Sequence, residues 1–150
     1  MKRTLALTAS LLAIVLSAGL RAASNAHTSF TGGVGATNPC NGEGISATGP
    51  VKIVYVEDDG HFVVHVSFKA AGVGVAGNSY QFSFQGTEQF DAPTSVAGNV
   101  SIFDLPVDGQ VITRGGAPNF EWDLGIRVFV VNGRGTGATF IGPSTTTCHG

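Results

Sequence analysis

A recurrent alternation of apolar and polar residues is the feature that most constrains the fold of this chain. It runs through residues 61–69 (HFVVHVSFK), 79–85 (SYQFSFQ) and 119–131 (NFEWDLGIRVFVV). Successive side chains of an extended strand point to opposite faces of a sheet, so this pattern gives each strand an apolar face and a polar face. No segment after residue 26 repeats with the period of a helix. The sequence therefore predicts an all-β protein built on an antiparallel sheet.

Turn signals indicate how these strands connect. Asp59-Gly60 is a favoured pair for a type I′ turn between strands expected at 51–57 and 61–69, and it sets Val56 opposite Val63. The sequence NGRG at 132–135 predicts a second turn. Further strands are expected at 99–105, 110–114 and 137–142.

The number of expected strands indicates an architecture. About seven short-linked strands are typical of an antiparallel meander closed into a small barrel, and a β-sandwich is the alternative. The pattern does not choose between the two.

The N-terminal segment has the layout of a secretory signal peptide. Lys2 and Arg3 precede an uncharged, mostly apolar run, and small residues follow it. We expect residues 1–26 to be the signal peptide and 27–150 a single secreted β domain, with cleavage after Ser24 as the rival site. No later segment is apolar enough to insert in a membrane. The expected location is extracellular or periplasmic.

The charge of the expected mature chain bears on its partners. Three of the 8 Lys and Arg residues lie in the leader and none of the 10 Asp and Glu residues do, which leaves five cations, ten carboxylates and a net charge of −5. Such a chain has no cluster of cations to neutralise phosphates. We therefore expect no nucleic acid and no anionic membrane surface among its partners.

The two cysteines predict one disulfide. Cys40 lies near the start of the mature chain and Cys148 near its end, and an oxidising compartment favours their pairing. Metal ligation is the alternative, but two cysteines this far apart lack the spacing of a zinc site.

A glycine pattern raises the possibility of a nucleotide-binding loop. Gly72, Gly74 and Gly77 spell G-x-G-x-x-G, with Asp91 downstream. In dinucleotide-binding proteins that loop leads into a helix whose N-terminal amides bind the pyrophosphate. Here the following residues, NSYQFSFQG, have the pattern of a strand. We interpret residues 70–78 as a flexible connection between strands, and Asp91 as a coincidence.

Histidines are the candidate metal ligands. An N-terminal His27 would offer its amine and its imidazole to one copper ion, as in secreted β-sandwich monooxygenases that attack polysaccharides. His61, His65 or His149 would have to supply the second imidazole. His61 and His65 are four residues apart on one strand, about 13 Å, which is too far to share an ion. We expect no cofactor and no metal, with His27 as the remaining candidate ligand.

Two carboxylates are the candidate hydrolytic residues. Glu121 and Asp123 are two positions apart on one strand, about 6.6 Å, a spacing that suits a glycosidase-like acid and base pair. Both lie on the face expected to be solvated. An ordinary charged sheet face is the simpler interpretation.

Three quoted stretches resemble a known group of proteins. They are NPCNGEGISATG (38–49), DDGHFVVHVSFKAAGVGVAGNSY (58–80) and NFEWDLGIRVFVVNGRG with the later TTTC, which ends at Cys148. Together they resemble a group of uncharacterised small secreted bacterial proteins that open on N-P-C-x-G-E and close on a cysteine. The resemblance implies a signal peptide, an all-β domain and a terminal disulfide, and it implies no activity. This chain departs from the group in the two residues after Cys148.

Together these patterns favour a secreted, disulfide-closed β domain that binds or scaffolds rather than catalyses. If the sheet closes as a barrel, an apolar ligand could enter an aromatic interior; a packed interior would leave function to surface contacts with a partner. The aromatic residues expected inside are Phe62, Phe68, Tyr80, Phe82, Phe84 and Trp122. The alternative function is an extracellular enzyme, either a copper histidine-brace oxidase or a hydrolase.

Overall fold

Eight β-strands make up nearly all of residues 24–149, the part of the chain that this computed structural model describes, the side chains of residues 143 and 144 excepted. The strands are β1 (Ser24–Thr37), β2 (Gly44–Asp58), β3 (His61–Gly74), β4 (Ser79–Phe90), β5 (Ser95–Ala97), β6 (Val100–Arg114), β7 (Asn119–Val131) and β8 (Arg134–His149). No helix occurs within residues 24–149. The prediction of an all-β protein is confirmed.

All eight strands belong to one antiparallel sheet. Its hydrogen-bonded order is β1-β2-β3-β4-β6-β7-β8, and the short β5 pairs with β6 beside this path. Neighbours along the path are consecutive in sequence except where β5 is passed over, so the meander is confirmed. No ladder joins β1 to β8 within the described residues. The sheet is therefore not closed into a barrel, one of the two architectures that the strand count predicted.

The strand count fixes the relative direction of the two edge strands. Seven strands lie on the path, and each runs opposite to its neighbour. The first and the seventh strand, β1 and β8, therefore run in the same direction. A ladder between them would be parallel, which is slightly less stable per residue than the antiparallel ladders elsewhere in this sheet.

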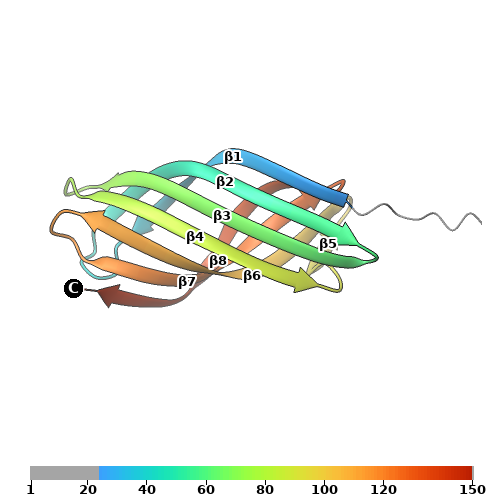
Figure 1. Cartoon of the computed structure of the whole chain (residues 1–150). Helices are drawn as coiled ribbons and strands as arrows, with labels where there is room; N and C mark the ends of the chain where they lie inside the picture. Colours follow the sequence, from blue (N-terminus) through green and yellow to red (C-terminus); the bar gives the residue numbers. More distant parts are fainter. Residues whose placement is uncertain (1–23, 150) are drawn as a thin grey trace, which may run out of the picture.

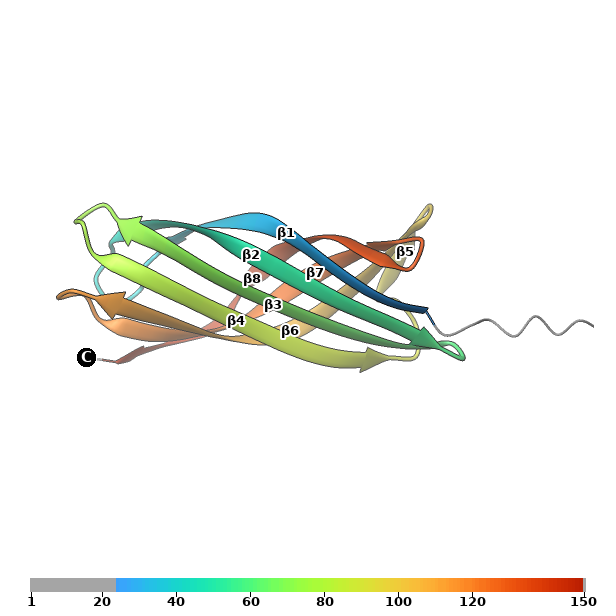
Figure 2. The ribbon, with the colours of Figure 1, turned by 45° about the horizontal axis from the view of Figure 1, so that its top comes forward.

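The sheet nevertheless curls round a single core. Figures 1 and 2 both show β7 and β8 passing behind β3 and β4, on the far side of the roll. β1 and β8 come close to each other. At one end of the roll, a Cβ atom at Gly133 would lie 3.5 Å from the Ser24 hydroxyl oxygen. At the other end, the Cys40–Cys148 disulfide links the β1–β2 loop to β8, with the two Cα atoms 5.8 Å apart. We call the space between β1 and β8 the seam; the disulfide holds one of its ends.

The β2–β3 hairpin forms as the turn chemistry predicted. Asp59 and Gly60 both have positive φ, 48° and 81°, as a type I′ turn requires. Val56 pairs with Val63. Asn132 and Gly133 make the equivalent turn between β7 and β8, with φ of 50° and 73°.

Three strand predictions need correction. The segments expected as separate strands at 99–105 and 110–114 form one strand, β6. Pro106 does not interrupt β6, because only one neighbouring strand pairs with β6 at that residue. Pro106 lies in the ladder with β7, whereas the ladder with β4 begins at Asp108. β8 extends to His149 instead of ending near residue 142, and β1 was not predicted as a strand.

The inward faces of the strands build an aromatic core. Of the six aromatic residues expected inside, Phe68, Tyr80, Phe82 and Phe84 are buried, and Phe62 and Trp122 are half-buried and pack against the core. A second group of rings, Tyr55, Phe62, Phe90 and Phe103, packs together with centroids 5.1–6.2 Å apart. Side chains fill most of the interior of the roll.

The expected leader lies mostly outside the described residues. Residues 1–23 are not among them, whereas Ser24, Asn25 and Ala26 form the first three residues of β1 and pair with β2. Within residues 24–149 there is no helix that is long and apolar enough to cross a membrane.

Candidate functional site

An apolar pocket opens at the seam, between the unpaired edges of β1 and β8. Its volume is about 170 Å³. Two edge strands and three inner strands line it: Phe30, Gly32 and Gly33 of β1, Val51 of β2, Val66 and Phe68 of β3, Ile126 of β7, and Ala138, Thr139 and Phe140 of β8. We call this cavity the seam pocket.

Small residues on the two edges leave the space that the pocket occupies. Gly32 turns towards the core, where a Cβ atom would lie 2.6 Å from Val51 Cγ2. Ala138 faces it from β8 and is half-buried. Larger side chains at these positions would fill the cavity, so the pocket follows from the residues of the two edge strands.

Aromatic rings form one wall of the seam pocket. Phe68 and Phe140 contact each other edge to face, with centroids 6.4 Å apart. Phe140 is 36% exposed although it lies on the inward face, opposite the buried Ile126. A large apolar side chain that stays partly exposed inside a pocket gains from a ligand that covers it.

The seam pocket carries no charge, and its polar groups lie at the rim. None of the described residues that line it has an ionisable side chain. Thr139 brings one hydroxyl, and the backbone of the β1 edge pairs with no neighbouring strand there. This combination suits an uncharged apolar molecule with a single polar group.

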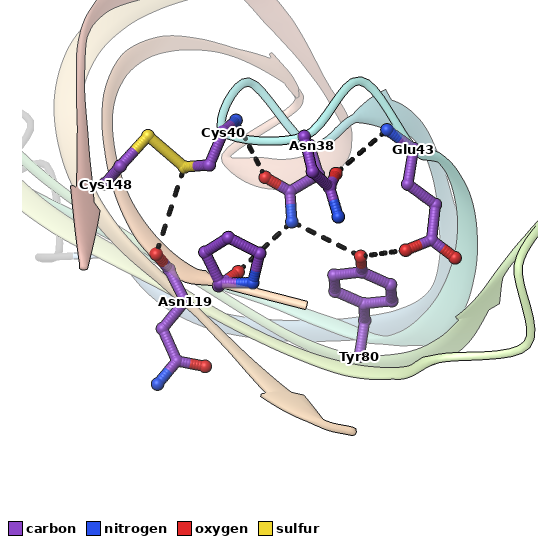
Figure 3. Close-up of a disulfide and its surroundings, with 8 residues drawn as sticks. Asn38, Cys40, Glu43, Tyr80, Asn119 and Cys148 are labelled. Carbon is purple, nitrogen blue, oxygen red and sulfur yellow. Dashed lines mark hydrogen bonds between the residues drawn. A yellow bond between two sulfur atoms is a disulfide. The ribbon is translucent and has the colours of Figure 1, made fainter. Parts of the chain in front are cut away.

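A buried polar network closes the disulfide end of the roll. Figure 3 shows Asn38 and Glu43 of the β1–β2 loop facing Tyr80 of β4, beside the disulfide. The Glu43 carboxylate accepts hydrogen bonds from the Tyr80 hydroxyl (2.6 Å), the Asn78 side chain (2.7 Å) and the backbone N–H of Ala76 (3.0 Å). Asn38, which is fully buried, donates to Tyr80 and to the Pro118 carbonyl. We call these residues the Glu43 network.

The electrostatics of the network keep Glu43 ionised. The hydrogen bond from Tyr80 is the main cause that lowers the pKa of Glu43, and those from Asn78 and Ala76 add to it, against the opposing effect of burial. Burial, followed by the bond to Glu43, raises the pKa of Tyr80. Tyr80 therefore stays a neutral donor at neutral pH. Each donor already has its acceptor, so the network holds the β1–β2 loop in place.

The glycine pattern belongs to this network, which corrects its interpretation as a flexible connection. Gly72 and Gly74 lie within β3, and only residues 75–78 form the turn. A Cβ atom at Gly74 would overlap the Glu43 carboxylate, and one at Gly72 would overlap the backbone of β2. Gly77 has a φ of 87° in the turn. Gly72 and Gly74 thus allow close contacts within the protein.

The candidate histidines lie on the outer surface and at separate places. His27 of β1 and His65 of β3 share one cross-strand row, but Val54 of β2 stands between them. His65 Nδ1 is 2.7 Å from the Thr87 hydroxyl, and His61 Nδ1 is 3.0 Å from an Asp91 carboxylate oxygen. His149 lies 3.6 Å from Glu121. Within residues 24–149, no three histidine, cysteine or acidic side chains form a group that could hold a metal ion.

The two candidate carboxylates lie on the outer face of β7, as expected. Both side chains are exposed. Asp123 accepts a hydrogen bond from the Thr145 hydroxyl (2.6 Å), and Asp108 of β6 stands opposite it. None of the pockets described here lies between Glu121 and Asp123.

Sequence reasoning did not identify the seam pocket or the Glu43 network. The network joins residues that are far apart in the sequence: Asn38 and Glu43 contact Tyr80. The only sequence signal for these three residues is that they lie in the motifs NPCNGEG and GVGVAGNSY. Nothing in the sequence signalled the pocket, because it forms between strands that do not pair.

Comparison of this chain with protein-family models, with curated proteins and with solved structures found no match.

Proposed function

We propose that this chain is a non-catalytic binding module that holds a small apolar molecule in the seam pocket. The observation that carries the proposal is an uncharged pocket of about 170 Å³ between two strand edges that do not pair. A cavity of about 150 Å³ lined by aliphatic and aromatic side chains is enough to bind one benzene ring. In this account the roll works as an incompletely closed barrel, whose wall the ligand completes at the seam.

We further propose that the module acts outside the cytoplasm. The Cys40–Cys148 bond supports this location, because structural disulfides persist in oxidising compartments. The leader-like residues 1–26 support export, and the resemblance to small secreted bacterial proteins agrees with it. Membership of that group is likewise our proposal; the motifs behind it supply the residues around Glu43.

The pocket favours a small molecule over an inserted strand of a partner protein. A strand that entered the seam would need a gap of about two strand spacings, near 10 Å, along its length. The disulfide holds one end of the seam together. A molecule that enters from the side needs neither end to open.

Filling the pocket tests this function. In Ala138→Leu the added side chain points into the seam pocket, and we expect the affinity for toluene, measured by isothermal titration calorimetry, to fall by about tenfold or more. Ala97→Leu, on the exposed strand β5, is the matched control and should bind toluene as the unaltered chain does. Saturable toluene binding that Ala138→Leu leaves unchanged, or no saturable binding to the unaltered chain, would contradict the proposal.

A further inference from the structure

Phe140 lies between the seam pocket and solvent. It lines the pocket and is still 36% exposed. Its ring contacts two core rings, with centroids 5.6 Å from Phe84 and 6.4 Å from Phe68. Across the seam, β1 brings Gly32 and Gly33 to the pocket, and neither has a side chain that could hold the ring. Within the described residues no strand pairs with β8 on that side. The ring is therefore supported from the core and not from across the seam.

A β-bulge directly follows Phe140. Phe140 pairs with Ile126 of β7. Next along the ladder the register shifts, and Gly125 of β7 stands opposite two residues of β8, Ile141 and Gly142. An extra residue in one strand interrupts the ladder, bends the strand and re-aims the neighbouring side chains. The bulge thus sets the direction of Phe140 and leaves β8 less firmly paired beside it.

Two glycines make this bulge possible. A Cβ atom at Gly125 would lie 2.6 Å from Ile141 Cγ1, so the Ile141 side chain occupies the space over Gly125. Gly142 has a φ of 116°, a conformation that residues with a side chain rarely adopt. A Cβ atom at Gly142 would meet nothing within 4 Å, so only the backbone conformation requires glycine there.

We propose that Phe140 is the gate of the seam pocket and that it opens by a movement of β8 at the bulge formed by Ile141 and Gly142. In the closed position the ring covers the pocket. In the open position an apolar molecule enters from the side. This inference rests on the proposed function, because it states how the ligand of the same pocket gains access.

A gate and a fixed wall differ in their effect on association. A gate lowers the association rate of the ligand to the fraction of time for which the gate is open. A fixed wall only adds contacts to the bound ligand. Loss of a fixed wall therefore raises the dissociation rate and leaves the association rate unchanged.

Removing the ring distinguishes these two roles. The dissociation constant of toluene would be measured by isothermal titration calorimetry, and its dissociation rate by NMR exchange at the Ile126 methyl signals. The ratio of the dissociation rate to the dissociation constant gives the association rate. We expect Phe140→Ala to raise that association rate by about tenfold or more. Val96→Ala, on β5 and 64% exposed outside the seam pocket, is the matched control and should change neither rate.

The outcomes separate the gate from the proposed function. Faster dissociation of toluene with an unchanged association rate would overturn the gate and make Phe140 a fixed wall. Toluene still binds in that case, so the proposed function would stand. No saturable binding of toluene to the unaltered chain would remove both. Phe140→Leu keeps an apolar side chain against the core, and it gives the same test with a smaller rise if Phe140→Ala does not fold.

The bulge can be tested without a change in the pocket lining. Gly142→Ala adds a methyl group that meets no neighbouring atom, so the substitution acts through the backbone conformation alone. We expect the altered bulge to displace Phe140 and to raise the association rate of toluene by about threefold or more. Gly116→Ala, which also meets nothing within 4 Å but has no positive φ, is the matched control. Equal association rates in these two variants would overturn the role of the bulge.

Discussion

The structure of the disulfide end of the roll depends on one residue, Glu43. It is 7% exposed, and its charge is balanced by three hydrogen-bond donors instead of a cation. A buried charge held only by neutral donors is stable while each donor stays in place. The loop 38–43, the turn 75–78 and Tyr80 should therefore order together.

Acid titration should expose this dependence. Because the folded pKa of Glu43 lies below its usual value of 4.5, the stabilisation is complete above that value and is lost as the pH falls through the lowered folded pKa. We expect the melting temperature to fall between pH 5 and pH 3 by more in the unaltered chain than in Glu43→Gln, which is less stable at pH 7. Parallel pH profiles, measured by circular dichroism, would contradict the role assigned to Glu43.

The Tyr80 hydroxyl can be tested separately. Tyr80→Phe keeps the buried ring and removes the shortest hydrogen bond to Glu43. A hydrogen bond to a charged group contributes about 1.5–3 kcal/mol, so we expect the free energy of unfolding to fall by that amount in urea denaturation at pH 7. Tyr55→Phe, which removes a hydroxyl bonded to Glu57 near the other end of the sheet, is the comparison variant. A smaller loss for Tyr80→Phe than for Tyr55→Phe would argue against the network.

At the scale of elements, sequence patterns predicted the strands that alternate and missed those that do not. The hairpin 51–69 was predicted down to its register, because Asp59-Gly60 and the alternating apolar residues require the same pairing. β1 was missed because residues 31–37 (TGGVGAT) hold few apolar side chains to alternate. The end of β8 was missed for the same reason, since residues 144–147 (STTT) are polar throughout.

The C-terminal half of β3 leaves room for the Glu43 carboxylate, and its glycine-rich composition did not predict this role. Gly74→Ala places a Cβ atom against the Glu43 carboxylate, so we expect a loss of about 1–3 kcal/mol in unfolding free energy. Gly35→Ala, also within a strand, meets nothing within 4 Å and is the matched control. Replacing glycine at such a compatible site stabilises by about 0.4–1 kcal/mol. Equal effects of the two substitutions would show that Gly74 serves only as a strand residue.

At the scale of the whole molecule, the seam lies between the first and the last strand of a seven-strand path. β1 and β8 run in the same direction, and the chain joins them by a covalent bond at one end instead of a ladder. The sequence signalled the disulfide through its two cysteines. The sequence could not predict the seam. The number of strands and the closure of the sheet depend on which segments pair, and β1 and the end of β8 have no alternating pattern.

Removing the disulfide should destabilise the whole roll. The bond spans a sequence separation of 108 residues. For a loop of about 100 residues, the chain-entropy model gives about 4.7 kcal/mol. We expect the double variant Cys40→Ser, Cys148→Ser to lose stability of this order in urea denaturation, and the reduced unaltered chain to match it. A double variant as stable as the oxidised chain would show that the Glu43 network alone holds this end.

The most direct test of ligand binding at the seam is methyl NMR of the unaltered chain during titration with toluene. We expect saturable shifts of the methyl signals of Val51, Val66 and Ile126, which line the seam pocket. The signals of Leu105 and Val107, which are buried elsewhere in the core, should stay in place. Shifts spread evenly over both groups, or no saturable shift at the pocket, would contradict the claim that this protein binds an apolar ligand at its seam.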